Sequence, residues 1–235
     1  MPIINDLEFF PRLREIIDMG WISIPDEAGY RGTGGPGLLL ESLIGVDVNN
    51  RDGPDTGIWE LKYHSGSAPI TLFHLSPNPR GIMHDVVRGY GWPNDRGQTS
   101  FRHTLWGKSN RGFYVFNDEE TQRIVIRKNG EENNPNAPEA YWEHDKLINA
   151  FVYKLRRLAL VKGRKKREQV KYESVVLYSD PNTTGLIKAI ASGKIAIDFD
   201  ARTNTGARGL RDHGTKFRIK SGDLKDLYSK RQFLD

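Results

Sequence analysis

Apolar residues recur along this chain at intervals of three and four, the spacing that places them on one face of a helix. The segment from residue 5 to residue 19 shows it most simply, with Asn5 or Asp6 as the N-cap and Gly20 as the stop. Residues 146–163 carry the longest such stripe, ending at Gly163. The same reasoning predicts helices at four other places: residues 36–45, 82–90, 183–193 and 221–234.

Other segments alternate apolar and polar residues, which is typical of strands. They are residues 21–25, 58–63, 68–75, 122–128, 170–180 and 194–202. We expect 58–63 and 68–75 to pair antiparallel through the turn HSGSAP, and 101–118 to form a hairpin around GKSNRG. The polar loop 130–140 is a candidate lobe boundary or hinge. Strands and helices follow one another without a βαβ rhythm, which favours a mixed α/β fold with an antiparallel-rich sheet.

Composition narrows the class of protein only slightly. The chain has 235 residues, enough for one large domain or two lobes, and no cysteine, which fits a reducing compartment such as the cytoplasm. No run is apolar enough for a signal peptide or a membrane span. A net charge of +5 suits a DNA-binding protein but also an ordinary solvated surface. The basic run GRKKRE at 163–168 fits phosphate binding or a charged tip equally well.

The candidate chemistry lies in the pattern D-x4-E-x-K, formed by Asp55, Glu60 and Lys62. On a strand that begins near Ile58, Glu60 and Lys62 point to the same face. Asp55 lies in the preceding turn and can fold back onto that face. Two carboxylates beside an amine suit a hard divalent cation and a charged substrate, which suggests a Mg²⁺-dependent nuclease. A surface ion-pair cluster at a strand end is the other interpretation.

The sequence leaves two interpretations open for each of two further polar residues. Glu41 lies in an otherwise apolar helix, so it is either a surface residue or a carboxylate that faces Asp55 and Glu60. His74 ends a strand, and is either a hydrogen-bonded polar residue or a DNA contact.

Five blocks of sequence together resemble one known family. They are GLLLE (37–41), D-x4-E-L-K (55–62), TLFH (71–74), LWGKSNRGFY (105–114) and DHGTKFRI (212–219). In this order the blocks resemble the MvaI/BcnI group of restriction endonucleases, which are relatives of the mismatch-repair nickase MutH. The acidic pattern alone is weak, because such short patterns recur by chance; the ordered set is far more specific.

The resemblance implies a restriction-endonuclease-like fold, a mixed β-sheet flanked by helices, with two lobes around double-stranded DNA. We expect residues 1–150 to be mainly the catalytic lobe and 151–235 mainly the DNA-recognition lobe, with possible interleaving. It also implies a type II enzyme that acts as a monomer on short pseudosymmetric sites of the CC-N-GG type. Such a monomer would nick each strand in turn and would have a cognate DNA methyltransferase as a partner in the same system.

On this interpretation Asp55, Glu60 and the main-chain carbonyl of Leu61 bind Mg²⁺. Lys62 stabilises charge at the phosphate or activates water, and Glu41 orients the assembly or adds a metal ligand. Arginine and lysine suit guanine, and carboxylates suit the cytosine amino group. The candidate DNA-binding residues are His74, Lys108, Arg111, Asp200, Arg202, Arg208, Arg211, His213, Lys216 and Arg218. About half of these side chains are expected to contact phosphates or water instead.

Two alternatives to a restriction enzyme remain at the level of sequence. A MutH-like repair nickase would need partner proteins to act. A DNA-binding module without catalysis would use Asp55, Glu60 and Lys62 only structurally.

Overall fold

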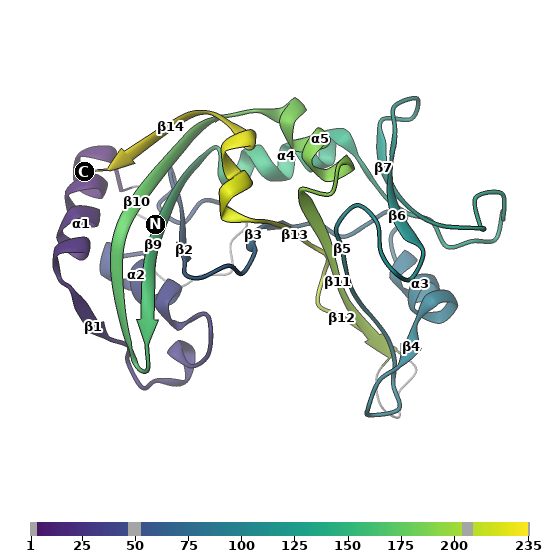
Figure 1. The fold of residues 1–235 in the computed structure, drawn as a ribbon, viewed down its shortest axis with the longest axis horizontal. Helices are drawn as coiled ribbons and strands as arrows, with labels where there is room; N and C mark the ends of the chain where they lie inside the picture. The colour runs from purple at the N-terminus through teal and green to yellow at the C-terminus, as the bar shows by residue number, and fades with distance from the viewer. Residues whose placement is uncertain (1–3, 47–52, 204–208, 235) are drawn as a thin grey trace. The chain divides into compact units, whose positions relative to one another are not determined.

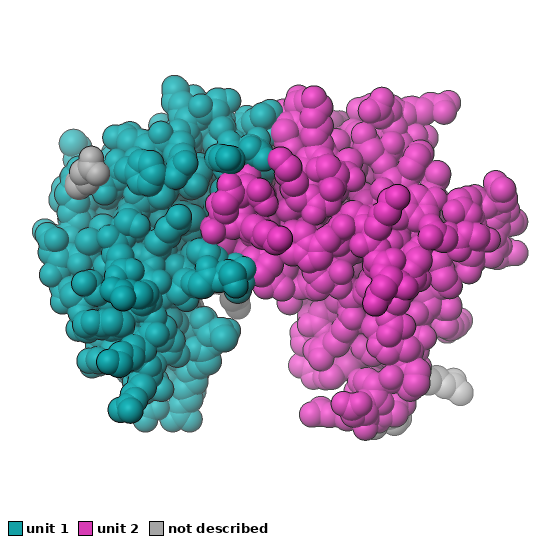
Figure 2. Space-filling view, viewed as in Figure 1, with its two compact units in different colours: residues 1–68, 152–182, 224–235 teal, residues 69–151, 183–223 magenta. Residues whose placement is uncertain are grey.

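The computed structural model describes residues 4–46, 53–203 and 209–234. The chain forms two compact units, each built from separate segments (Figure 2). Unit 1 comprises residues 1–68, 152–182 and 224–235, and unit 2 comprises residues 69–151 and 183–223. The expected division into a catalytic lobe, residues 1–150, and a DNA-recognition lobe, residues 151–235, is a division by role and stays a prediction. The polar loop 130–140 lies inside unit 2, so the prediction that it is a boundary is wrong.

Unit 1 contains a five-stranded mixed sheet (Figure 1). Its strands are β1 (Trp21–Ser23), β2 (Glu60–His64), β9 (Arg157–Lys166), β10 (Gln169–Pro181) and β14 (Tyr228–Leu234). They run in the order β1-β10-β9-β2, with β14 also on β10; β2 and β9 are parallel and the other pairs antiparallel. Unit 1 also contains helices α1 (Asp6–Asp18) and α2 (Gly35–Ile44) and the 3-10 turn η1 (Ala28–Tyr30).

The core of unit 1 explains why these elements form. Phe9, Leu13 and Ile16 lie on one face of α1 and are buried with Leu40 and Ile44 of α2. Leu61, Ala159, Val161 and Tyr172 contribute from the strands to the same core. Asn5, one of the two N-cap residues predicted from the sequence, caps α1 by accepting hydrogen bonds from the amides of Leu7 and Glu8.

Unit 2 is built on two antiparallel sheets. The larger has the order β3-β13-β11-β5-β4 with β12 beside β11, and the smaller has the order β6-β7-β8. The bounds are β3 (Ile70–His74), β4 (Trp92–Pro93), β5 (Thr99–Leu105), β6 (Phe113–Asp118), β7 (Arg123–Lys128), β8 (Ala140–Glu143), β11 (Ile195–Thr203), β12 (Leu210–Asp212) and β13 (Lys216–Ile219). Helices α3 (Ile82–Tyr90) and α5 (Thr183–Ala191) pack on β11. The remaining elements, α4 (His144–Leu155) and the 3-10 helix η2 (Ser221–Leu227), carry the chain from unit 2 to unit 1.

The mixed α/β class with an antiparallel-rich arrangement is confirmed, but the helix predicted for residues 146–163 is wrong. It ends at Leu155, and the second half is strand β9. Leu158, Ala159, Leu160 and Val161 are all fully buried, because β9 lies between β2 and β10 in the middle of the sheet. A strand covered on both faces is continuously apolar, and such a run cannot be distinguished from a helix by its periodicity.

The predicted pairing of residues 58–63 with 68–75 and the predicted closing helix are also wrong. Strand β2 pairs with β9 and β3 pairs with β13, so the two strands belong to different sheets. The hairpin predicted around GKSNRG is confirmed only at its tip, where Lys108 and Tyr114 form an antiparallel bridge and the Val115 amide donates to the Gly107 carbonyl at 2.7 Å. Beyond the tip, β5 pairs with β11 and β4, while β6 pairs with β7. Residues 221–234 form η2 and then β14, whose register on β10 is set by long-range pairing. GRKKRE forms the end of β9 and the two-residue turn of the β9–β10 hairpin, and Arg164 pairs with Glu173 of β10.

No helix within the described ranges is long and apolar enough to cross a membrane.

Candidate active site

The turn before β2 is shaped by a buried threonine. The Thr56 hydroxyl oxygen accepts a hydrogen bond from the Trp59 amide at 2.8 Å and donates one to the Trp59 carbonyl at 3.2 Å. This local bonding closes the turn directly after Asp55. The Asp55 carboxylate folds back over the strand, where its Oδ2 accepts a 2.7 Å hydrogen bond from the Leu61 amide. The turn therefore places Asp55 beside β2, the position expected from the sequence.

Glu60 is the buried centre of the cluster, with only 2% of its side chain exposed. Its Oε1 accepts a 2.7 Å hydrogen bond from Lys62 Nζ, so both side chains share one face of β2. Lys154 Nζ lies 3.6 Å from the same oxygen. Within the described part of the chain, the buried Oε2 atom has no hydrogen-bond partner. Burial raises the pKa of Glu60, whereas the neighbouring charge of Lys62 acts to lower it.

Glu41 reaches the same electrostatic environment from α2. Its pKa is raised to about 7, mainly by burial and also by the negative charges of Asp55 and Glu60, while the ammonium groups of Lys62 and Lys154 act to lower it. Interactions of this size require the groups to lie near one another. Glu41 is thus part of the cluster rather than an isolated surface residue.

The donor chemistry of this cluster fits a hard divalent cation. No group of three or more His, Cys, Asp and Glu side chains could enclose an ion by itself among residues 4–46, 53–203 and 209–234. Mg²⁺, however, commonly binds one or two carboxylates and completes its shell with water and substrate phosphate oxygens. Asp55, Glu60 and the Leu61 carbonyl could supply such a partial shell. The unpartnered Glu60 Oε2 is a buried acceptor of the kind that a cation satisfies.

In unit 2, the large sheet has one apolar and one polar face. Phe199 of β11, Phe101 of β5 and Phe217 of β13 are buried on the apolar side. The alternate positions carry polar residues, because neighbouring side chains of a strand point to opposite faces. Cross-strand pairs on the polar side are Asp198 with Thr104 and Lys216, Asp200 with Arg102, Arg202 with Arg211, and His74 with Lys216. We call this set, together with Arg218, the polar sheet face.

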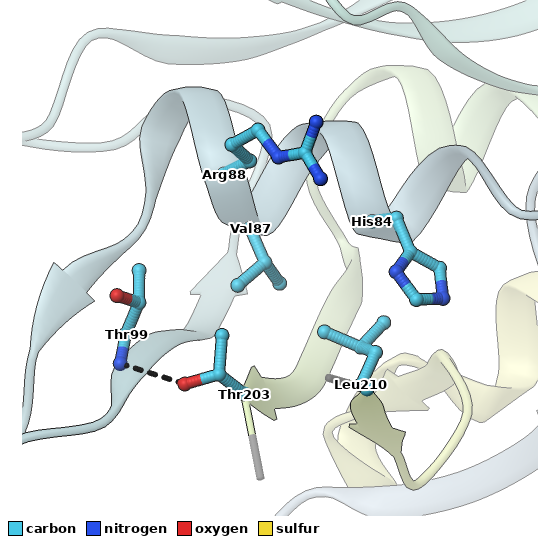
Figure 3. A pocket seen from close by; sticks show the side chains of 7 residues that line it. His84, Val87, Arg88, Thr99, Thr203 and Leu210 are labelled. Atoms are coloured by element: carbon cyan, nitrogen blue, oxygen red, sulfur yellow. Dashed lines mark hydrogen bonds between the residues drawn. The ribbon is translucent and has the colours of Figure 1, made fainter. Parts of the chain in front are cut away.

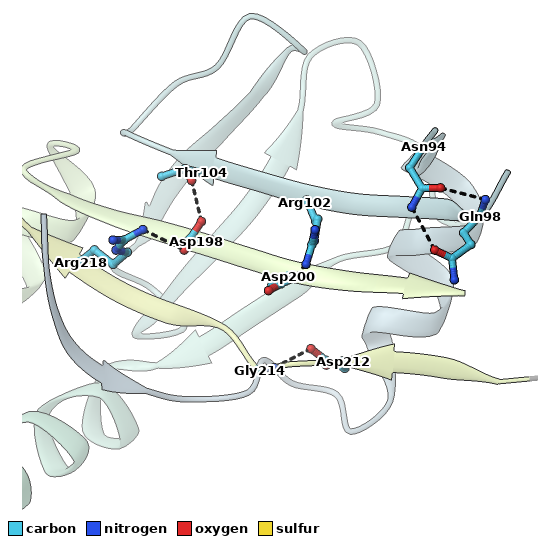
Figure 4. Close-up of polar contacts among 9 residues, drawn as sticks. All are labelled: Asn94, Gln98, Arg102, Thr104, Asp198, Asp200, Asp212, Gly214 and Arg218. Atoms are coloured by element: carbon cyan, nitrogen blue, oxygen red, sulfur yellow. Dashed lines mark hydrogen bonds and ion pairs between the residues drawn. The ribbon is translucent and has the colours of Figure 1, made fainter. Parts of the chain in front are cut away.

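Acidic and basic groups are bonded to each other on this face (Figure 4). Arg102 Nε donates a 2.6 Å hydrogen bond to Asp200 Oδ1. Asp198 accepts from the Thr104 hydroxyl at 2.5 Å and pairs with Arg218 at 3.3 Å. Burial acts to raise the pKa of Asp200, but the hydrogen bond and charge of Arg102 outweigh it, so the pKa is lowered.

The remaining DNA-binding candidates are more dispersed. The His213 amide donates to the Asp200 carbonyl at 2.9 Å, which fixes the β12–β13 connection beside the polar sheet face. Arg111 lies elsewhere, with its guanidinium 3.8 Å above the Trp92 ring, and Trp92 packs on Phe101 from the apolar side. Lys108 is exposed in the same β5–β6 connection. Arg208 lies outside the described residues.

Sequence reasoning missed Arg102, Thr104 and Lys154. Alternation along FRHTL places Arg102 and Thr104 on one face, but only the β5–β11 register brings them to Asp200 and Asp198. Lys154 falls inside the longer helix predicted for residues 146–163, where its charge carries no signal of a site. The helix ends one residue later, and this ending leaves its ammonium group at Glu60.

Two hollows of unit 2 lie beside α3. One of about 620 Å³ is lined by His84, Val87, Arg88, Thr99, Thr203, Gly209 and Leu210 (Figure 3). A neighbouring one of about 450 Å³ shares His84 and Leu210. Their linings contain none of Glu41, Asp55, Glu60 and Lys62, all of which belong to unit 1.

Comparisons with known proteins indicate a nuclease, as the chemistry of the acidic cluster does. A family model described as the MvaI/BcnI restriction endonuclease family matches residues 10–228. No curated protein sequence matches the chain. A structure of restriction endonuclease MvaI with its cognate DNA substrate has a TM-score of 0.80 at 25% identity, covering 99% of this chain and 100% of that one. MvaI without DNA has a TM-score of 0.61 at 25% identity, with 100% of both chains covered.

Proposed function

The chain belongs to the MvaI/BcnI restriction endonuclease family and is a type II site-specific deoxyribonuclease, and we propose that it requires Mg²⁺ and acts as a monomer. Its substrate on this proposal is double-stranded DNA containing a short pseudosymmetric CC-N-GG-type site, nicked on one strand and then on the other. The bound DNA of the similar MvaI complex supports the substrate class. A cognate DNA methyltransferase belongs to the proposed system.

The observation that carries this proposal is the grouping of Asp55, Glu60 and Lys62 at β2. The Asp55 carboxylate reaches the Leu61 amide, and the Lys62 ammonium group lies 2.7 Å from a buried carboxylate oxygen. A structural ion pair alone would leave no reason for a second buried oxygen of Glu60 without a partner.

Each residue has a proposed task in phosphodiester hydrolysis. Asp55, Glu60 and the Leu61 carbonyl would hold the divalent cation, which would supply positive charge at the phosphoryl oxygens. Lys62 donates hydrogen bonds to the phosphate and the attacking water, and stabilises the charge that develops there. Glu41 orients the acidic cluster from α2. Residues of the polar sheet face read the base edges, with arginines suited to guanine and Asp198 and Asp200 suited to cytosine amino groups.

Plasmid digestion tests the proposal. With Mg²⁺ alone, the purified protein should convert supercoiled plasmid to nicked circles and then to discrete linear fragments, because one active site cuts one strand at a time. Run-off sequencing of the fragments then gives the site. Lys62→Ala should lower the rate by at least about a hundredfold, as expected for loss of a group that stabilises transition-state charge.

Three results would contradict parts of the proposal. Cleavage in excess EDTA would exclude the metal. Undiminished cleavage by Lys62→Ala would exclude the active-site assignment. Nicking without linear products, or a need for added proteins, would favour a repair nickase.

A further inference from the structure

Lys154 brings a second ammonium group to the proposed metal site. Its Nζ lies 3.6 Å from Glu60 Oε1, the oxygen that already accepts the hydrogen bond of Lys62. The Lys154 side chain is 26% exposed, so it is partly withdrawn from solvent. It comes from the last turn of α4, far in sequence from the D-x4-E-x-K pattern.

Its backbone is held firmly. The next residue, Leu155, is fully buried, and its carbonyl accepts a 2.8 Å hydrogen bond from the buried Tyr228 hydroxyl of β14. The end of α4 is therefore fixed at Glu60 by packing and by a buried hydrogen bond. An ordinary surface lysine lacks such support, and its ion pairs contribute little.

The two lysines differ in how they engage Glu60. Lys62 hydrogen-bonds Oε1 at 2.7 Å, whereas Lys154 at 3.6 Å lies beyond a good hydrogen bond and is held mainly by charge. A buried carboxylate needs compensating charge, and a divalent cation on the same carboxylate would be repelled by an ammonium group already there. Of the two lysines, Lys154 is bonded more weakly to Glu60, so a divalent cation would displace Lys154 first.

We propose that Lys154 is a positioning residue that holds Glu60 in the metal-free enzyme, competes with the divalent cation for that carboxylate, and so keeps the metal affinity of the DNA-free enzyme low. This inference rests on the metal site of the proposed function. Lys154 leaves Glu60 when the site is loaded. A DNA phosphate at that site then provides a new partner for the released ammonium group.

Calorimetric titration of the DNA-free protein with Mn²⁺ tests the competition. Lys154→Met keeps the length of the side chain and removes its charge, and should tighten Mn²⁺ binding by about tenfold or more, because a cation–dication repulsion is lost. Lys154→Arg keeps the charge and should bind Mn²⁺ close to the wild-type affinity. Lys146→Met, an exposed position in the first turn of α4, is the matched control and should not change the affinity.

The outcomes separate this inference from the site on which it rests. Damage to the fold would loosen the site and weaken binding, so tighter binding by Lys154→Met is not a structural side effect. Unchanged or weaker binding by Lys154→Met overturns the role of Lys154 but leaves the metal site intact, provided that Glu60→Gln abolishes Mn²⁺ binding. If Glu60→Gln binds Mn²⁺ as the wild type does, the metal site itself is wrong and the inference falls with it.

A crystal of the wild-type protein soaked in Mn²⁺ gives a second measurement, which does not depend on any variant folding. The Lys154 Nζ to Glu60 Oε1 separation should grow beyond ion-pair reach. A bound ion with that separation still at 3.6 Å would overturn the proposal.

Discussion

Three acidic side chains, those of Glu41, Asp55 and Glu60, lie near two ammonium groups in the candidate active site. A half-buried acid among such charges can make the stability of the fold depend strongly on pH. The pKa of Glu41 is raised to about 7 from 4.5, first by burial and then by the charges of Asp55 and Glu60. Ionised Glu41 is therefore unfavourable in the folded, metal-free enzyme. A divalent cation would relieve that cost, which gives Glu41 a reason to lie beside the site without being a ligand.

Because its pKa is raised in the folded protein, Glu41 lowers the stability of the fold as pH rises. Below pH 4.5 Glu41 is protonated in both folded and unfolded chains and has no effect. Above it the unfolded chain ionises first, so the free energy of unfolding falls as pH rises, until the folded group ionises near pH 7. Glu41→Gln removes this loss. In buffer without divalent cations, the variant should be more stable than wild type at pH 8 by about 2 kcal/mol, a value reduced for partial exposure, and equal to it at pH 4.

Urea unfolding at the two pH values measures this difference. Asp26→Asn, an exposed acid of unit 1, is a suitable control and should behave like the wild type at both. Equal effects of Glu41→Gln at pH 4 and pH 8 would show that the side chain acts through packing rather than charge.

At the level of elements, the geometry of the site depends on the short turn before β2. The buried Thr56 hydroxyl bonds both the amide and the carbonyl of Trp59, and Asp55 immediately precedes it. Thr56→Val keeps the shape and leaves a buried amide without its partner. We expect a loss of about 1–3 kcal/mol in the free energy of unfolding, and weaker Mn²⁺ binding because Asp55 is no longer fixed.

Urea unfolding and calorimetric titration with Mn²⁺ measure the two effects, and Thr56→Ser, which keeps the hydroxyl, should restore both. Full metal affinity in Thr56→Val would mean that β2 alone positions Asp55.

The sequence was informative for elements whose signal is local. The cap at Asn5, the stripe of α1 and the alternation of β2 depend on neighbouring residues, and all were predicted. The fold-back of Asp55 followed from the turn residues around it. The ends of α4 and the identity of β9 could not be predicted, because they depend on a central position in a sheet that long-range pairing creates.

The same limit explains the missed partners. Arg102 and Thr104 are adjacent to acids only through the register of β5 on β11, with nearly a hundred residues between the paired strands. A shift of one residue would send both side chains to the apolar face. Most residues predicted to read DNA do lie on the polar sheet face, but Arg111 stacks on Trp92 instead. Residue type predicts chemistry here, while strand pairing decides which residues meet.

For the whole molecule, the arrangement of charge matters more than its total. The net charge of +5 is modest, and on the polar sheet face two arginines are already bonded to acids, Arg102 to Asp200 and Arg218 to Asp198. If this face reads DNA as proposed, such pairing would keep the arginines from binding any phosphate indiscriminately and would hold them in orientations suited to base edges. Specificity should therefore depend on the two acids as much as on the arginines.

The double variant Asp198→Asn/Asp200→Asn releases both arginines. Its binding to non-specific DNA in Ca²⁺ should tighten and depend more steeply on salt, with the slope of log K against log salt more negative by up to about 1.8, or 0.9 for each added phosphate contact. The affinity advantage of the cognate site should shrink at the same time, because base contacts are lost.

Fluorescence anisotropy from 50 to 200 mM salt would measure both the salt slope and the cognate preference, because phosphate contacts are most visible over this range. Glu173→Gln also releases an arginine, Arg164, but in unit 1, and should leave the cognate preference unchanged. If the double variant keeps the wild-type slope and preference, the polar sheet face is not where this enzyme reads DNA.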